Sequence, residues 1–258
     1  MLYKIGITEA GDAGIDLSWA EKLSNVDAAV LITKSISQSF IDSALKYMEK
    51  LIIHATITGY GHTILEPNVP TLVDESTMVT KIVESGFPIE RIVIRVDPII
   101  PTDKGIKTAY HVITSFMKMG FCRYRVSVID MYPHCRARFK ECGLPLVYGE
   151  NGFLPSKTQL VQVDDMLKKA KVFWNALDNN KLLRIESCAE KGLKEAIACG
   201  CISDYDFELL GLKKDVEANT MGYQRKGCMC YAGKTELLNH KTRCSNGCLY
   251  CYWKDKTD

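Results

Sequence analysis

The chain has 258 residues, of which 47% are hydrophobic and 25% are charged, and its formal net charge is +2. These proportions are those of an ordinary globular protein and exclude a disordered or low-complexity chain. No apolar run approaches the roughly 20 residues that a membrane-spanning helix needs. The first residues also lack the basic patch and apolar stretch of a signal peptide. We therefore expect a cytoplasmic protein that does not act at a membrane.

Short apolar or β-branched runs alternate with segments of helical spacing along the first 212 residues. The runs predict six strands, at residues 3–8, 28–33, 51–57, 91–96, 125–129 and 182–186. The segments between them predict helices at 35–50, 74–85, 107–119 and 156–178. Strand–helix alternation is typical of a parallel sheet, either open and doubly wound or curled into a partial barrel. We predict an α/β fold with a (βα)6 partial TIM-type barrel over residues 1–212.

Cysteine is the unusual feature of the composition. Eight of the eleven cysteines lie from Cys188 onward, within the last 71 residues. Because disulfides are rare in the cytoplasm, clustered cysteines there indicate metal or redox chemistry. Beyond Leu212 the apolar periodicity fades, and residues 213–258 carry nine basic against five acidic side chains. We predict that this range is a cysteine-rich, cluster-binding extension that packs on the mouth of the barrel.

Ligands of parallel α/β folds collect at the carboxyl ends of the strands, which nominates residues near the predicted strand ends. The nominated residues are Thr33, Lys34, residues 58–62, Arg95, Asp97, Asp130 and Glu186. Of these, Lys34, Arg95, Asp97 and Glu186 are candidates to bind a cofactor.

Each candidate has a functional and a structural interpretation. Arg95 could hold a carboxylate or a phosphate through a bidentate contact, and Lys34 could meet an anionic group or lie in solvent. Asp97 could bind a ribose hydroxyl or pair with Arg95. Tyr60 could stack on adenine, relay a radical or simply pack. The catalytic residues therefore stay unknown, with Tyr60, Arg95 and Asp97 as candidates.

The strongest motif is formed by Cys244, Cys248 and Cys251, which are separated by three and then two residues. Three thiolates at this spacing can hold three corners of a [4Fe–4S] cluster and leave the fourth iron open. A zinc site that also uses His240 is the alternative. Cysteines at this spacing, with an aromatic residue such as Tyr250 before the last one, resemble the radical S-adenosylmethionine signature. That resemblance implies a cluster whose open iron binds S-adenosylmethionine, with Tyr250 packed against the bound cofactor.

Residues 26–34, 56–70 and 91–101, together with the cysteine-rich tail, resemble the DUF1848 family over about residues 26–253. That family comprises uncharacterised bacterial and phage proteins whose C-terminus resembles a radical S-adenosylmethionine cluster loop. In the resembled family, segments that match Cys188, Cys201, Cys228 and Cys230 recur before the loop. The resemblance implies that these four thiolates could close an auxiliary [4Fe–4S] cluster. Zinc is the main competing occupant, and small buried cysteines without a metal are the structural alternative.

The sequence thus predicts a radical S-adenosylmethionine enzyme that makes a 5′-deoxyadenosyl radical and acts on an unidentified small molecule, nucleotide or nucleic acid. The electron would come from a one-electron donor such as flavodoxin or ferredoxin. One alternative is a zinc-binding module that recognises nucleic acid without redox turnover. Another is a radical enzyme that acts on DNA or nucleotides, as spore photoproduct lyase does. The basic run 134–140 could bind phosphate, but the solvated face of a short helix is the favoured interpretation.

Overall fold

In the computed structural model, residues 3–177, 180–188, 190, 192–213, 229–239 and 244–253 are described. Eight parallel strands form one curled sheet of half-barrel shape. Their bounds are β1 Ile5–Ile7, β2 Ala28–Thr33, β3 Leu51–Thr56, β4 Ile92–Ile99, β5 Arg123–Val128, β6 Arg184–Cys188, β7 Ile197–Cys199 and β8 Lys234–Glu236. The α-helices are α1 Trp19–Lys22, α2 Gln38–Lys46, α3 Leu72–Glu84, α4 Asp103–Lys118, α5 Pro133–Glu141, α6 Lys157–Asn175 and α7 Asp204–Leu209. Three short 3-10 helices cover η1 Leu23–Asn25, η2 Met48–Lys50 and η3 Ile89–Arg91.

The strand order distinguishes between the two architectures that the sequence left open. From β1 to β7 every strand pairs with its neighbour in the chain, and β8 pairs with β1 at the other edge. A doubly wound sheet reverses its strand order near the middle, whereas a barrel-type sheet does not. The sheet is therefore of the partial-barrel type.

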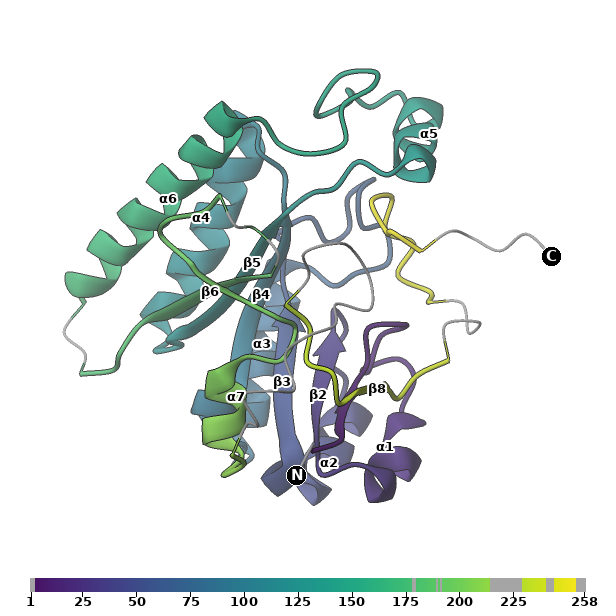
Figure 1. Ribbon diagram of the computed structural model, residues 1–258, viewed down its shortest axis with the longest axis vertical. Helices are drawn as coiled ribbons and strands as arrows, with labels where there is room; N and C mark the ends of the chain where they lie inside the picture. Colours follow the sequence, from purple (N-terminus) through teal and green to yellow (C-terminus); the bar gives the residue numbers. More distant parts are fainter. Residues whose placement is uncertain are drawn as a thin grey trace.

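The predicted number of six strands was wrong, because the sheet also contains β7 and β8. Both additional strands are three residues long, which is too short for an alternating pattern to stand out in a sequence. β8 lies within the range 213–258, so this C-terminal range contributes a strand to the sheet. In Figure 1 the yellow C-terminal segment runs back beside the purple N-terminal part of the chain.

The helices begin where hydrogen-bonding side chains cap them. Thr71 and Ser156 form capping boxes at the starts of α3 and α6, and Ser37 and Thr102 cap α2 and α4. The predicted helix 35–50 is shorter in the structure, where α2 ends at Lys46 and η2 follows. α4 and α6 pack side by side on the outside of the sheet (Figure 1).

The two faces of the sheet bury different kinds of side chain. Outward-facing residues such as Ile53, Ile94 and Val126 pack in one large apolar core that also includes residues of α2, α3, α4 and α6. Inward-facing residues form a second apolar cluster, which includes Ile7, Ile52 and three cysteines. Among the described residues, no helix combines the length and the apolar character needed to cross a membrane.

Candidate functional site

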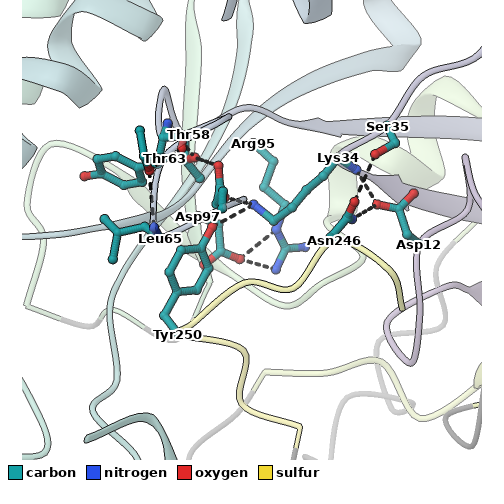
Figure 2. A network of polar contacts seen from close by, with 12 residues as sticks. Asp12, Lys34, Ser35, Thr58, Thr63, Leu65, Arg95, Asp97, Asn246 and Tyr250 are labelled. Carbon is teal, nitrogen blue, oxygen red and sulfur yellow. Dashed lines mark hydrogen bonds and ion pairs between the residues drawn. The ribbon is translucent and has the colours of Figure 1, made fainter. Parts of the chain in front are cut away.

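The segment of residues 244–251, here called the cysteine loop, lies against the ends of β2 and β3. Lys34, directly after β2, donates from its Nζ to the Tyr250 hydroxyl at 3.0 Å and to Glu66 Oε1 at 2.7 Å. The Tyr250 hydroxyl also donates to Glu66, and Thr58 donates to Glu66 Oε2 at 2.6 Å. Figure 2 shows Tyr250 reaching from the loop into this network. The loop is therefore held at the carboxyl edge of the sheet.

A second contact fixes the other half of the cysteine loop. Asn246 Nδ2 donates to Asp12 Oδ2 at 2.7 Å, and its Oδ1 accepts from the Ser35 hydroxyl at 3.1 Å. Asp12 also accepts from the Thr33 hydroxyl at 2.5 Å and from the Lys34 backbone N–H at 2.8 Å. Both Asp12 and Asn246 are buried, so these hydrogen bonds are shielded from water.

Helix α5 holds the end of the cysteine loop. The Arg138 guanidinium donates to the backbone carbonyls of Cys251 at 2.8 Å and Trp253 at 3.0 Å. The Cys135 thiol lies 3.3 Å from the Cys251 carbonyl oxygen, to which it donates. The basic run 134–140 forms a short helix, as favoured from the sequence, but its Arg138 and Cys135 face the loop.

The three thiols of the loop share one electrostatic environment. Burial raises the pKa of Cys248 to about 12, although the nearby charge of Lys34 acts in the opposite direction. Burial also raises the pKa of Cys244, and Cys251 adds to the shift in both thiols. For Lys34 itself, burial favours the neutral amine, but the Glu66 carboxylate outweighs it and leaves the pKa of Lys34 raised. Lys34 is thus a cation that faces both Glu66 and a cysteine of the loop.

Arg95 and Asp97 form an ion pair within β4. The Arg95 Nε donates to Asp97 Oδ2 at 2.7 Å, and its Nη2 makes a second contact with the same oxygen. Ser127 donates to the other oxygen of Asp97. The Arg95 Nη1 is buried and has no hydrogen-bond partner among the described residues. The interpretation that Asp97 pairs with Arg95 is therefore correct. The Nη1 group of Arg95 is left available to a ligand.

Two strands are longer than expected, which changes the position of several candidates. β4 extends to Ile99 and β6 extends to Cys188, so Arg95, Asp97 and Glu186 lie inside strands, and the prediction that they lie at strand ends was wrong. Glu186 accepts from Arg125 at 2.7 Å and from Arg184 at 2.8 Å in the interior of the half-barrel. Its carboxylate is committed to these arginines.

Tyr60 and Tyr250 belong to the same apolar cluster near the strand ends. Burial raises the pKa of Tyr60 to about 12, so its phenol stays protonated at neutral pH. Tyr60 is buried, as the packing interpretation expects. Asp130 follows β5 at the same edge of the sheet.

The other predicted cysteine set lies inside the half-barrel. Cys188, Cys201 and Cys230 are buried there, with Sγ–Sγ separations of 3.7 Å between Cys188 and Cys201 and 4.0 Å between Cys201 and Cys230. Cys228 and His240 lie outside the described residues. Among the described residues, no group of three or more His, Cys, Asp or Glu side chains is arranged so that it could hold a metal ion.

Sequence reasoning did not find several residues that build the site. Asp12, Glu66 and Asn246 make the contacts that hold the cysteine loop, and Arg138 and Cys135 hold its end. Asn246 lies within the cysteine motif, but the motif is defined by the spacing of its cysteines and takes no account of the residues between them. The other four contact the loop from more than 100 residues away in the chain, which no local pattern reveals.

Comparison with known proteins identifies one family. No curated protein matches the chain. The sequence profile described as a domain of unknown function, DUF1848, matches residues 17–253. The match runs from before β2 through the whole cysteine loop and covers most of the chain. The protein therefore belongs to the DUF1848 family.

Proposed function

We propose that the protein is a radical S-adenosylmethionine enzyme whose catalytic cluster is held by Cys244, Cys248 and Cys251. The observation that carries this proposal is the position of the cysteine loop at the carboxyl edge of a partial barrel. In folds of this type, that edge is where ligands and reacting groups meet. A loop packed on the opposite end of the strands would not support the proposal.

The donor set suits an iron–sulfur cluster. Three thiols on one short loop act on one another electrostatically, and thiolates are the ligands that such clusters need. The nearby Cys135 thiol donates to the loop backbone, which suits a positioning role and leaves three ligands for the cluster. When bound, a [4Fe–4S] cluster would supply one electron for the C–S cleavage of S-adenosylmethionine that yields a 5′-deoxyadenosyl radical.

The chain's own residues have distinct tasks in this proposal. Lys34 places a positive charge near Cys248 and so favours its thiolate form. Tyr250 fastens the loop through Lys34 and Glu66, so in this proposal its hydroxyl has a positioning role. The buried Arg95 Nη1, on a residue inside β4, would donate to the carboxylate of S-adenosylmethionine. A flavodoxin- or ferredoxin-like protein would deliver the electron.

The nucleic-acid alternatives receive no support from the basic run. Arg136 donates to the Gly152 carbonyl at 3.0 Å, and Arg138 donates to the end of the cysteine loop. These two guanidinium groups therefore have structural partners, and the substrate class is left open.

The decisive experiment compares Cys248→Ala with Cys142→Ala. Cys142 is an exposed cysteine at the end of α5 and serves as the matched control. After anaerobic reconstitution, we expect the wild type and the control to bind about four irons per chain and to form 5′-deoxyadenosine from added S-adenosylmethionine with dithionite as the electron source. Cys248→Ala should keep its circular dichroism spectrum and lose at least 99% of that product. Undiminished 5′-deoxyadenosine in Cys248→Ala, or a colourless wild type, would overturn the proposal.

A further inference from the structure

A row of polar side chains crosses the inner face of β3, β4 and β5, which lie side by side in the middle of the sheet (Figure 1). Thr56 is the register partner of Arg95, and Arg95 is the register partner of Arg125. Because neighbouring strands are about 4.8 Å apart, these three residues share one level of the half-barrel. Ile53 packs in the outer core, so the alternation along β3 turns its neighbour His54 inward, on the same face as Thr56. These four polar residues are here called the inner polar row.

Each member of the inner polar row has a buried polar atom without a hydrogen-bond partner among the described residues. The atoms are Thr56 Oγ1, Arg95 Nη1, Arg125 Nε and the two ring nitrogens of His54. The side chains of His54 and Arg125 are 0% exposed. Folded proteins pair about 90% or more of their buried polar atoms. Five unpaired atoms on three adjoining strands therefore indicate a polar ligand at this place.

The two arginines are held in place by their other nitrogen atoms. Arg125 donates from Nη1 to the Gly200 carbonyl at 2.6 Å and from Nη2 to Glu186 at 2.7 Å. Arg95 uses Nε and Nη2 for Asp97, so its Nη1 is likewise fixed in direction. A guanidinium N–H can only donate, so the ligand atoms that face these two groups must be hydrogen-bond acceptors.

The charges around the row favour a ligand with a single negative charge. Four guanidinium groups and three carboxylates form ion pairs in the interior of the half-barrel. The pairs are Arg95–Asp97, Arg123–Asp206, Arg125–Glu186 and Arg184–Glu186. Because Glu186 serves two arginines, one positive charge within these four pairs has no counter-charge. A carboxylate would supply one negative charge, whereas a phosphate monoester would bring about −1.5 to −2.

His54 and Thr56 add neutral hydrogen-bonding groups beside the arginines. Burial holds the pKa of His54 well below its ordinary value, and the charges of Arg125 and Arg95 act in the same direction. The imidazole is therefore neutral, with one N–H donor and one acceptor nitrogen. The Thr56 hydroxyl can donate as well. Together with the Arg125 Nε, these groups present three donors toward the two oxygens of a carboxylate.

We propose that His54, Thr56 and Arg125 bind the carboxylate of a small organic acid inside the half-barrel. In the enzyme proposed above this acid would be the substrate, and that part of the inference rests on the proposed function. The Arg95 Nη1 is assigned there to the carboxylate of S-adenosylmethionine, which leaves the other three members of the row for the acid. S-adenosylmethionine does not supply the missing negative charge, because its ammonium and sulfonium groups outweigh its carboxylate.

The experiment follows the ring resonances of His54 by nuclear magnetic resonance in the full-length protein with isotope-labelled histidine. The chain has five histidines, and the spectrum of His54→Gln identifies the resonance that belongs to His54. The probes are sodium acetate and inorganic phosphate, with chloride keeping the ionic strength constant. We expect acetate to shift the His54 resonance until the site is saturated, and phosphate to need at least a tenfold higher concentration. No shift with acetate, or an equal response to phosphate, would overturn the proposal.

A matched pair of threonine variants tests the contact itself. Thr56→Val keeps the shape of the side chain and removes its hydroxyl, so we expect the affinity for acetate to fall about fivefold. Thr114→Val is the control, because Thr114 is a buried threonine of α4 whose hydroxyl donates to the Tyr110 carbonyl at 2.8 Å. This control should bind acetate as the wild type does. Unchanged affinity in Thr56→Val would refute the site.

Arg125→Lys keeps the positive charge and removes the Nε donor, so its affinity for acetate should fall at least tenfold. The variant also loses hydrogen bonds that hold Gly200 and Glu186, and Thr56→Val carries the test where Arg125→Lys does not fold. Affinity that is unchanged in folded Arg125→Lys would contradict the role of this arginine.

A variant with Cys244, Cys248 and Cys251 all changed to alanine separates this proposal from the enzymatic one. The variant has no thiol in the cysteine loop, and we expect it to bind acetate with the affinity of the wild type. Acetate binding by a wild type that forms no 5′-deoxyadenosine would refute the proposed function and leave the carboxylate site in place. Formation of 5′-deoxyadenosine without any acetate binding would refute the site alone. Loss of acetate binding in the triple variant would also count against the site.

Discussion

The cysteine loop and the three buried cysteines Cys188, Cys201 and Cys230, here called the inner cysteine set, lie in the same half-barrel but are held in different ways. The loop is fastened by side-chain hydrogen bonds to Asp12, Lys34 and Glu66. The inner set is buried among apolar residues, and the close approach of backbone at Gly200 positions it. An arrangement on polar side chains can present thiols to a ligand, whereas a packed interior serves the stability of the fold. The loop is thus held by polar side-chain contacts, and the inner set is held by packing of the backbone.

The Arg95–Asp97 pair lies between the two regions. The Arg95 guanidinium interacts electrostatically with Cys188 and Cys201, and Asp97 interacts in the same way with Lys34 beside the loop. Tyr252, directly after the loop, is within electrostatic reach of both Cys251 and Cys201. Arg95, Asp97 and Tyr252 are thus the residues through which a change at the loop would reach the inner set.

The largest effect is expected from Glu66→Gln. The Glu66 side chain is 1% exposed and is the counter-charge of Lys34, so the variant leaves a largely buried ammonium group unpaired. Breaking such a pair costs about 3 kcal/mol of unfolding free energy, measurable by urea denaturation. Lys34→Met in the same chain should recover part of the loss, because no unpaired charge is left.

The control for this pair is Glu195→Gln, which breaks the more exposed ion pair with Lys171. Exposed pairs are screened by water, so this change should cost less than about 1 kcal/mol. Additive effects of Glu66→Gln and Lys34→Met would show that the pair does not stabilise the loop.

A smaller and local effect is expected from Asn246→Ala. The change removes a buried donor to Asp12 and a part-buried acceptor for the Ser35 hydroxyl, and it costs about 2 kcal/mol of local stability. Hydrogen exchange of the Leu249 amide, which donates to the Leu65 carbonyl, should become faster. Ser245→Ala, at the exposed neighbouring position, should leave that exchange rate unchanged. Equal exchange in the two variants would refute the role of the Asn246 side chain.

Much of the fold could be predicted because its elements are long enough to carry a pattern. β2 has the predicted bounds, and α3, α4 and α6 lie within a few residues of theirs. β7 and β8 were missed because three residues cannot show an alternation. Their pairing depends on the curvature of the sheet, which no single segment of sequence encodes.

The candidate site was predictable only where a local rule applies. Lys34 was nominated because it follows a strand, and it does contact the cysteine loop. Glu66 and Asp12 lie in irregular segments, so no periodic pattern marks them. Arg138 was interpreted as part of a solvated helix face, but its partner Cys251 lies 113 residues away in the chain. Long-range contacts of this kind decide the function of a polar residue, and its own neighbours in the sequence do not.

The smallest effect concerns the pair that lies between the two regions. Burial disfavours ionised Asp97, but Arg95 and the Ser127 hydroxyl outweigh this and lower the pKa of Asp97 below its ordinary value. The folded state therefore binds its proton less readily than the unfolded chain, whose pKa is about 3.9. The stability contributed by Asp97 is present above that value and is lost as the pH falls from it toward the folded pKa. In Asp97→Asn this loss is absent, so the difference in unfolding free energy between wild type and variant should shrink by about 1 kcal/mol or less between pH 5 and pH 3, which are round figures on either side of the unfolded pKa. A difference that stays constant over this range would show that Arg95 and Ser127 do not stabilise the ionised carboxylate of Asp97.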